Sequence, residues 1–232
     1  MIRLKPRLQL IADFVRKGVP FADVGTDHAY IPAWLLINKI SPFGLASDIK
    51  KGPLENAYKN LSKYNLTDKV TLIQTDGIPK EAYDIYPLDI IIAGMGGEMI
   101  CSIIENAGID IHHHRLILQP MTDAPMVRRY LYDKGFNITD EKLTREGDKL
   151  YSAMTAVYMG ESISYTDIDI FVGKNLVEHG GEVFDLYLKK NINRLNIILD
   201  GYKKSSLNDR EFVSKIKYQL KIFEDIRSDL NG

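Results

Sequence analysis

The stretch FADVGTDHAYIP, from Phe21 to Pro32, decides the fold. It predicts a short buried strand, a tight turn at Gly25, a polar pair Asp27-His28 and then a helix. In an α/β protein, a nucleotide-like ligand meets the carboxyl end of the first strand at such a turn. Gly25 would let the backbone approach that ligand closely. A strand, turn and helix without any ligand is the alternative that these residues leave open.

The glycine pattern of this turn argues against a dinucleotide. A dinucleotide-binding turn carries G-x-G-x-x-G, which seats a pyrophosphate on the N-terminus of the helix. Here Gly25 stands alone and is followed by Thr26 and Asp27. Carboxylates at Asp23 and Asp27 would repel a pyrophosphate, but they suit a ligand with positive groups. The ammonium and sulfonium groups of S-adenosylmethionine are of this kind.

Composition sets broad limits. The chain has 232 residues, of which 45% are hydrophobic and 26% charged, as is ordinary for a soluble globular protein. The net charge is −1, so a nucleic-acid partner must be met by a local basic patch. The single Cys101 allows no intrachain disulfide, which fits a reducing cytoplasm. We expect a cytoplasmic protein without membrane association, because no apolar run reaches membrane-spanning length and the N-terminus has no secretory signal.

Strands alternate with helices over the first part of the chain, which predicts a doubly wound α/β domain over residues 1–160. The run LDIIIA, 88–93, is typical of a central parallel strand covered on both faces. A helix is expected to start near Pro6. The other predicted strands are 21–24, 43–48, 70–74, 116–118 and 151–158, and the predicted helices between them are 30–38, 53–64, 99–107 and 125–134.

After Gly160 the pattern changes to two amphipathic helices. The segment 205–209 between them offers turn and N-cap residues, so we expect an antiparallel helical hairpin, coiled-coil-like, within a second domain over residues 161–232. The apolar residues that recur at spacings of three and four are Phe184, Leu188, Ile192, Leu195, Leu199 and Tyr202, then Val213, Ile216, Leu220 and Phe223.

Acidic residues end three successive predicted strands. Asp48 could accept hydrogen bonds from both ribose hydroxyls of an adenosine, although it could equally sit at a helix N-terminus. Asp76 could accept from an adenine amine, although Asp76-Gly77 is also an ordinary turn pair. Together with Asp23 and Asp27 they would lie along one edge of the sheet, where an adenosine fits. The run Ala93-Gly94-Met95-Gly96-Gly97 would let a flat substrate approach the backbone, and a flexible loop is the alternative.

These motifs resemble a known family. ADVGTDHAYIP, LASDI with Gly52-Pro53-Leu54, the run 74–77, IIAGMGGE and LILQP are similar to the bacterial tRNA (adenine-22-N1)-methyltransferase family, the TrmK family, over essentially the whole chain. The resemblance implies a class I S-adenosylmethionine-dependent methyltransferase domain of Rossmann-like fold. It also implies methyl transfer to N1 of an adenine in the D-loop region of tRNA. The cofactor-binding residues that we expect are Asp23, Gly25, Asp27, His28, Asp48, Ile49, Asp76, Gly77, Ala93, Gly94, Met95 and Gly96.

Adenine N1 has an in-plane lone pair and needs no general base. Positive charge moves from the sulfonium to the base, so a nearby carboxylate favours the reaction. We expect Asp27 to stabilise that charge, Tyr30 to stack on the base and His28 to position the substrate. The alternatives are a core-packed Tyr30 and a histidine that only packs or hydrogen-bonds. Asn60 is a weaker candidate for a polar contact to the cofactor or the base edge.

Basic clusters predict contacts to tRNA phosphates, although solvated helix faces are the alternative. Residues 186–222 carry nine Lys and Arg residues against three acidic ones, and a second cluster joins Arg3, Lys5, Arg7, Arg16 and Lys17. The run 112–114 is expected to be a loop, and we assign no metal. A monomer is expected, although the apolar stripe of the hairpin could also pack against a partner. The alternative functions are methylation of a small molecule or of another RNA position, and a non-catalytic RNA-binding protein. The expected RNA-binding residues are Arg7, Arg128, Arg129, Lys189, Lys190, Lys203 and Lys204.

Overall fold

The computed structural model describes residues 2–203 and 209–231 and divides the chain into two compact units, Met1–Tyr165 and Thr166–Gly232. The first unit is built on one seven-stranded sheet with the strand order β3-β2-β1-β4-β5-β7-β6. Neighbours from β3 through β5 run parallel, whereas β7 is antiparallel to β5 and β6 is antiparallel to β7. The strands are β1 Phe21–Val24, β2 Gly44–Asp48, β3 Val70–Gln74, β4 Asp89–Gly96, β5 Arg115–Thr122, β6 Phe136–Glu146 and β7 Lys149–Tyr158.

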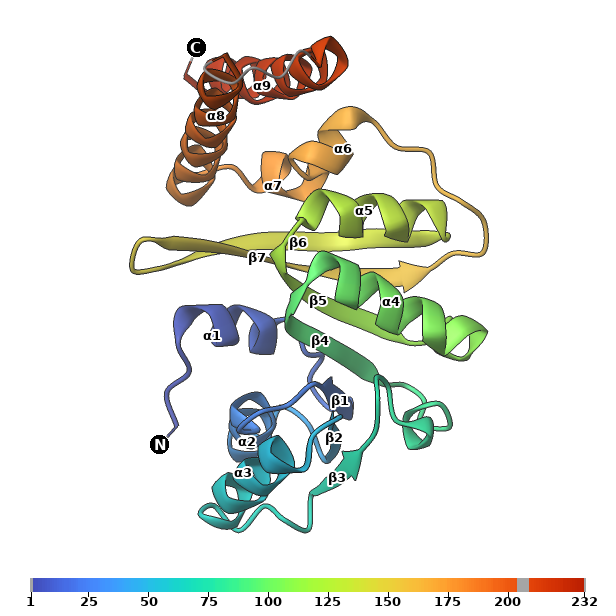
Figure 1. Ribbon diagram of the computed structural model, residues 1–232. Coiled ribbons are helices and arrows are strands. Elements are labelled where there is room, and N and C mark those ends of the chain that lie inside the picture. Colours follow the sequence, from blue (N-terminus) through green and yellow to red (C-terminus); the bar gives the residue numbers. More distant parts are fainter. Residues whose placement is uncertain (1, 204–208, 232) are drawn as a thin grey trace. The chain divides into compact units, whose positions relative to one another are not determined.

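Helices cover both faces of this sheet, as a doubly wound domain requires. On one face, α1 (Pro6–Asp13), α2 (Tyr30–Ile37) and α3 (Lys51–Ser62) pack in sequence, and on the other face α4 (Gly97–Ala107) and α5 (Ala124–Asp133) lie side by side (Figure 1). Two short 3₁₀ helices lie in connections: η1 (Lys80–Ala82) lies between β3 and β4, and η2 (Gly108–Ile111) lies between α4 and β5. The prediction of a Rossmann-like α/β domain is therefore confirmed.

The central strand β4 is apolar because both of its faces are covered. Ile90, Ile91 and Ile92 are fully buried, as are Ile117 and Leu118 on the neighbouring strand. This continuous apolar run is what distinguishes a parallel strand between two helix layers from a half-exposed antiparallel one. The order of the strands puts β1 and β4 side by side at the centre of the sheet. The chain therefore reverses its direction of winding between them, and that is where α/β sheets bind ligands.

A buried carboxylate at the start of β4 holds the end of the first helix. Asp89 is fully buried, and its side chain accepts from the backbone N–H of Arg16 at 2.8 Å and from Arg16 Nε at 2.8 Å. Arg16 Nη2 lies 2.7 Å from the same carboxylate and also donates to the carbonyl of Leu88. The segment after α1 is thereby fixed to the amino end of β4. Arg16 is thus a structural cation, and Lys17 is exposed beside it.

The hairpin of β6 and β7 departs from the prediction, which had only the second of these strands. The long strand β6 follows α5 directly and pairs with β7 from Phe136–Tyr158 to Glu146–Lys149. Its residues are mixed polar and apolar because it is the edge strand, with a bulge between Ile138 and Asp140. The alternation of apolar and polar residues that indicates a strand is weak in β6, so the sequence did not predict it.

The same strand corrects one predicted RNA contact. Arg128 on α5 is fully buried, and its Nε and Nη2 donate to the two carboxylate oxygens of Glu141 on β6 at 2.9 and 2.8 Å. Glu141 is 1% exposed, so the pair is closed to solvent. The prediction that Arg128 binds RNA is wrong, because its guanidinium is occupied inside the fold. The neighbouring Arg129 is exposed.

The second unit is helical. It contains α6 (Asp167–Phe171), α7 (Lys174–His179), α8 (Glu182–Lys203) and α9 (Arg210–Asn231). The two long helices run antiparallel, since Asp185 near the start of α8 pairs with Arg227 near the end of α9, and Tyr202 near the end of α8 contacts Phe212 near the start of α9. Asp209 caps α9 by accepting the N–H of Phe212 at 2.9 Å. The predicted turn residues 205–208 and the predicted RNA contact Lys204 lie outside the described residues.

The buried pair predicts a specific stability pattern. Glu141→Gln leaves the Arg128 charge buried without its carboxylate, and we expect it to lower the free energy of unfolding by about 3–5 kcal/mol in urea denaturation. Replacing both residues by apolar ones, with Arg128→Met and Glu141→Leu, should recover most of that loss because no uncompensated charge remains. Arg129→Ala is the matched control, with an expected change within about 0.5 kcal/mol. A Glu141→Gln protein as stable as the parent would contradict this account.

Candidate active site

The conformation of the turn between β1 and α2 is fixed by its backbone. Gly25 has φ of +75°, a conformation that L side chains rarely adopt, and the N–H groups of Gly25 and Thr26 both donate to the carbonyl of Ser47 at 2.8 Å. A Cβ at Gly25 would stand 2.1 Å from the terminal methyl carbon of Met95, which reaches across from β4. The turn therefore presents bare backbone at the carboxyl edge of the two central strands.

A cavity of about 670 Å³ opens beside this turn. Its walls come from three segments that are distant in sequence: the turn 25–31 with Asp23, the end of β4 at Ala93 and Gly94, and the N-terminal segment 3–8. The structure thus brings together six of the predicted cofactor residues, namely Asp23, Gly25, Asp27, His28, Ala93 and Gly94, and also the predicted Tyr30. A volume of this size suits a drug-sized or nucleoside-sized ligand.

One wall of the cavity is acidic. Asp23 is 8% exposed, and burial raises the pKa of its carboxyl from 3.8 to about 6, while a hydrogen bond with Thr26 acts in the opposite direction. Asp27 is largely exposed, and its carboxylate lies 3.3 Å from His28 Nε2. These two carboxyl groups, one buried and one exposed, favour a cationic ligand, because a nearby positive charge stabilises the ionised form of each carboxyl.

His28 and Tyr30 form the rim next to this acidic wall. Their ring centroids lie 5.2 Å apart, and the side chain of Asn60 donates to the carbonyl of His28 at 2.8 Å. Tyr30 is 46% exposed at the first residue of α2, so the alternative of a core-packed tyrosine is wrong. Asn60 acts here on the backbone of the turn. The exposed aromatic ring stays available to a planar ligand.

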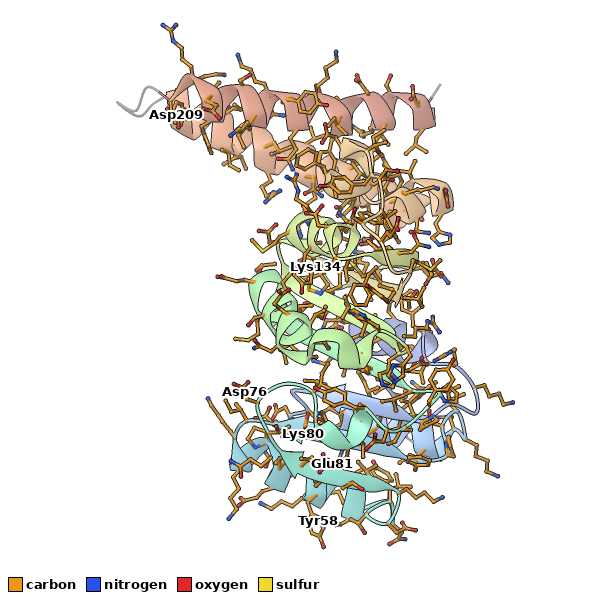
Figure 2. The ribbon with its side chains drawn as sticks, turned by 90° about the vertical axis from the view of Figure 1, so that its right-hand side faces the viewer. Tyr58, Asp76, Lys80, Glu81, Lys134 and Asp209 are labelled. Atoms are coloured by element: carbon orange, nitrogen blue, oxygen red, sulfur yellow. The ribbon has the colours of Figure 1, made fainter. Side chains whose placement is uncertain are left out.

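The other predicted cofactor residues follow along the same edge but do not line the cavity. Asp48 ends β2, and its Oδ1 accepts the N–H of Lys50 at 2.7 Å, while Ile49 is exposed. Figure 2 shows Asp76 on the loop that leads from β3 to the short helix with Lys80 and Glu81. Gly77 has φ of +81°, and its carbonyl accepts from the Ser47 hydroxyl at 3.2 Å. The hydrogen bond between Ser47 and Gly77 joins the end of β2 to the loop after β3.

The glycine run after the central apolar segment is not a flexible loop. Ala93, Gly94, Met95 and Gly96 form the last part of β4, where the pairing with β5 shifts register at two irregularities. Gly94 has φ of +79°. Irregular pairing of this kind changes the direction of a strand end and is frequent next to active sites. The backbone at Gly94 therefore faces the cavity while it still belongs to the sheet.

Basic residues also line the cavity, which sequence reasoning missed as a property of this site. Arg3, Lys5 and Arg7 all line the cavity, whereas Arg16 and Lys17 of the same predicted cluster lie near the amino end of β4. A partial signal was present for Arg3 and Lys5, which precede α1 at alternate positions, and Lys5 has extended backbone angles. Gln119 on β5 was also missed. It is fully buried and accepts from Arg7 Nη1 at 2.8 Å.

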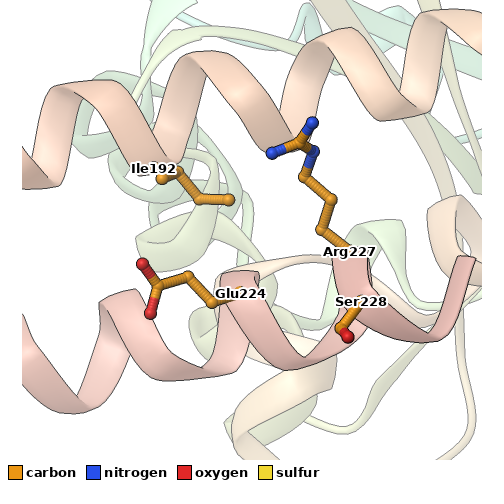
Figure 3. A pocket seen from close by; sticks show the side chains of 4 residues that line it. All are labelled: Ile192, Glu224, Arg227 and Ser228. Atoms are coloured by element: carbon orange, nitrogen blue, oxygen red, sulfur yellow. The ribbon is translucent and has the colours of Figure 1, made fainter. Parts of the chain in front are cut away.

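The remaining predicted RNA contacts lie elsewhere. Arg129 is exposed on α5, and Lys190 is exposed on α8. Lys189 lies 2.5 Å from Asp185, and Lys203 lies 3.0 Å from Asp200, so both are engaged within α8. A smaller hollow of about 290 Å³ lies between α8 and α9, where Figure 3 shows Ile192, Glu224, Arg227 and Ser228. Arg227 is paired with Asp185, and this hollow holds no arrangement for catalysis.

Other sites find no support within the described part of the chain. No three His, Cys, Asp or Glu side chains among residues 2–203 and 209–231 are grouped so that they could hold a metal ion. The described helices include none with the length and apolar character needed to cross a membrane. Burial raises the pKa of the Cys101 thiol to about 11, so it is protonated near neutrality and a poor nucleophile.

Comparisons with known proteins agree with this geometry. A family described as "Methyltransferase domain" matches residues 4–154. The tRNA (adenine(22)-N(1))-methyltransferase of Bacillus subtilis is 34% identical over 177 residues, which cover 74% of this chain and 72% of that protein. The chain belongs to the tRNA (adenine(22)-N(1))-methyltransferase family.

Solved structures related to this family match nearly the whole chain. The crystal structure of the B. subtilis m1A22 tRNA methyltransferase TrmK has a TM-score of 0.85 at 25% identity and covers 98% of this chain and 100% of its own. A Streptococcus pneumoniae protein in complex with S-adenosyl-L-methionine has a TM-score of 0.82 at 27% identity, with 95% and 98% coverage. The class I methyltransferase fold predicted from the motifs is confirmed.

The buried carboxyl predicts a pH-dependent stability. The folded-state pKa of Asp23 lies near 6, above its ordinary value of 3.8, so the folded protein binds this proton more tightly than the unfolded chain does. The protonated carboxyl therefore stabilises the fold fully below about pH 4, and this stabilisation is lost as the pH rises through 6. The expected loss is about 3 kcal/mol. Asp23→Asn should therefore be more stable than the parent at pH 8, with the difference vanishing near pH 4 in thermal or urea unfolding. The control Asp68→Asn, at an exposed residue, should show no such convergence.

The positive φ at Gly25 predicts a loss of ligand binding. Gly25→Ala introduces strain in the turn and a contact with the Met95 methyl, so the backbone must move away from the cavity. We expect at least about a tenfold weaker affinity for S-adenosylmethionine in calorimetry, which is about 1.4 kcal/mol. Gly52→Ala is the matched control, since nothing lies within 4 Å of its added Cβ in α3. Equal affinities of the two variants would count against this role of the turn.

Proposed function

We propose that this protein transfers a methyl group from S-adenosylmethionine to N1 of adenine 22 in the D-loop region of tRNA. The observation that carries the proposal is the cavity at the ends of β1 and β4, which has an acidic wall, a basic wall and bare backbone at Gly25 and Gly94. The chain's membership of the tRNA (adenine(22)-N(1))-methyltransferase family supports the reaction and the substrate.

The residues present fit the cofactor. Asp23 and Asp27 offer carboxylates to a ligand that carries both an ammonium and a sulfonium group, and the raised pKa of Asp23 means that a neighbouring cation would be favoured there. Asp48 at the end of β2 suits a ribose, and Asp76 with Gly77 suits an adenine amine. When bound, S-adenosylmethionine supplies an electrophilic methyl group on a positively charged sulfur.

The protein's own part in the reaction is positioning and electrostatics. Adenine N1 already carries an in-plane lone pair, so no side chain has to remove a proton. As positive charge passes to the base, the exposed carboxylate of Asp27 stabilises it, and the nearby His28 orients that carboxylate at 3.3 Å. Tyr30 stacks on the base, a contact worth about 1–3 kcal/mol. Alignment of N1, methyl carbon and sulfur supplies the rest.

The target edge of the base must leave the folded tRNA before transfer. Unstacking costs a few kcal/mol, which contacts to the surrounding backbone have to offset. Arg129 and Lys190 are candidates for such phosphate contacts because they are exposed cations of α5 and α8. Lys189 and Lys203 are also exposed, and a phosphate would replace Asp185 and Asp200 as their partners. Intact tRNA is accordingly the substrate, and the cytoplasm is the compartment where it is met. The protein works as a monomer in this proposal.

The direct test is transfer to tRNA. Unmodified bacterial tRNA and methyl-labelled S-adenosylmethionine are incubated with the protein, and the product nucleoside is identified by mass spectrometry and mapped by position. We expect 1-methyladenosine at position 22. A different methylated nucleoside would overturn the substrate, and cofactor binding without any transfer to tRNA would overturn the catalytic assignment in favour of a non-catalytic RNA-binding protein.

Asp27→Ala should separate catalysis from binding. Removing the carboxylate that faces the developing charge is expected to lower kcat roughly 10²–10³-fold, while tRNA affinity stays within about twofold. Single-turnover methylation and filter binding of tRNA give the two quantities. Asp68→Ala removes an exposed carboxylate near the start of β3, at the opposite edge of the sheet, and should leave both unchanged. Parallel losses of kcat and tRNA affinity in Asp27→Ala would contradict the assigned role.

A further inference from the structure

Met121 is an exposed apolar residue at the carboxyl end of β5, and the reaction proposed above gives it no role. It is 46% exposed and lies on the same face of the sheet as Gln119, two positions earlier in the strand. Gln119 is fully buried, and its side-chain oxygen accepts from Arg7, which lines the cavity. Met121 therefore lies beside the cavity, at the edge of the sheet where ligands bind.

The thioether of Met121 is held by a buried amide. The Nε2 of Gln119 donates to the carbonyl of Pro120 at 2.9 Å and to Met121 Sδ at 3.7 Å. The oxygen of the same amide is fixed by Arg7 Nη1 at 2.8 Å. A fully bonded buried group thus orients a methionine that remains open to solvent. Support of this kind is typical of a residue that must meet a ligand in one geometry.

The aromatic ring of the cofactor lies too far away to be the partner of Met121. Asp76, which suits the adenine amine, follows β3, and four strand spacings of about 4.8 Å separate β3 from β5, or about 19 Å. The amino-acid end of the cofactor carries an ammonium and a carboxylate. Both are better matched by the charged residues that line the cavity than by a thioether, which offers a charged group no compensating charge or strong hydrogen bond.

The target base, in contrast, has to approach on the β5 side. Transfer requires the sulfur, the methyl carbon and N1 in a line, so the base lies beyond the methyl group, away from the rest of the cofactor. In the proposed arrangement Asp48 and Asp76 hold the adenosine near β2 and β3, which leaves the half of the edge formed by β4 and β5. Met121 is exposed in that half.

The spacing of the strands suits a planar base between two side chains. β1 and β5 both neighbour β4, so about 10 Å separates them. A ring with van der Waals contacts on both faces needs about 7–8 Å, which is twice the contact distance. Tyr30 follows β1 and is exposed, and the small residues Ala93 and Gly94 line the cavity from the intervening strand. A base over the end of β4 would meet Tyr30 on one face and Met121 on the other.

We propose that Met121 packs against the face of the target adenine opposite Tyr30 and so orients N1 for transfer. The inference rests on the proposed function and names a further specificity-determining residue for it. A thioether is uncharged and polarisable and makes favourable contacts with aromatic rings. It can therefore hold a purine face without a hydrogen bond.

Oxidation by hydrogen peroxide gives a direct readout that needs no turnover. Peroxide transfers one oxygen atom to the methionine sulfur and leaves as water, and peptide mass spectrometry follows the rate at each methionine. With tRNA and S-adenosylhomocysteine bound, we expect the oxidation of Met121 to slow roughly three- to tenfold, because the base covers its sulfur. Met159 is the matched control. It is 64% exposed just after β7, at the opposite edge of the sheet, and its rate should not change.

Two further conditions separate the base from other sources of protection. S-adenosylhomocysteine alone should leave Met121 as reactive as in the free protein, and so should a tRNA that lacks the base at position 22. Protection by S-adenosylhomocysteine alone, equal protection by the abasic tRNA, or no protection by intact tRNA would each overturn the inference.

Substitutions test the same contact in the reaction. For Met121→Ala we expect kcat/KM for tRNA to fall roughly three- to tenfold, with the affinity for S-adenosylmethionine and the Tm unchanged. Met121→Leu keeps the apolar volume and should stay within about twofold of the parent. Met159→Ala should match the parent. A Met121→Ala protein with the parent's kcat/KM, or one whose cofactor affinity falls equally, would contradict the proposed contact.

Failure of this contact can be told apart from failure of the proposed function. A parent protein that methylates adenine 22 while Met121 fails these tests leaves the proposed function standing and refutes only the role of Met121. A parent protein without any transfer to tRNA refutes the proposed function itself, whatever the oxidation rate of Met121.

Discussion

The buried carboxylate of Asp89 is the constraint on which the site depends. A charge inside the sheet must be paired and hydrogen-bonded, and Arg16 meets that need with both its backbone and its guanidinium. This fastens the chain just after α1 to the amino end of β4. The start of the same helix then lies near the carboxyl ends of β4 and β5, where the side-chain oxygen of Gln119 accepts a hydrogen bond from Arg7. One helix thereby links the two ends of the central strand.

The division of charge within the cavity follows from this placement. The carboxylates of the cavity come from Asp23 in β1 and Asp27 in the turn after it, and the cations come from the segment before and at the start of α1. A reaction that moves positive charge from a sulfonium to a base needs an acid near the base and no cation near the sulfur. In the structure, these cations and carboxylates line one cavity from segments that are distant in sequence.

Much of the site could be predicted because it obeys local rules. Three features can be recognised in the sequence: a lone glycine after a buried strand, acidic residues at successive strand ends, and a strand end that contains glycines. Parallel strands then bring their carboxyl ends to one edge of the sheet. Arg128 shows where this reasoning fails. Its exposed neighbour Arg129 has the same residue type and the same local context, and only the partner Glu141, on a strand missed in the sequence, makes one of them structural.

The sequence by itself determined the α/β class, the methyltransferase motifs, the acids at successive strand ends and the two amphipathic helices, because each shows as a local pattern along the chain. Tertiary structure alone decided which cations are available, that Gly94 to Gly96 remain in a strand, and that Arg7 faces the same cavity as Asp27. The physical reason is that the burial and pairing of a charge depend on residues that are distant in sequence. Arg7 and Gln119 are 112 positions apart, and no local pattern relates them.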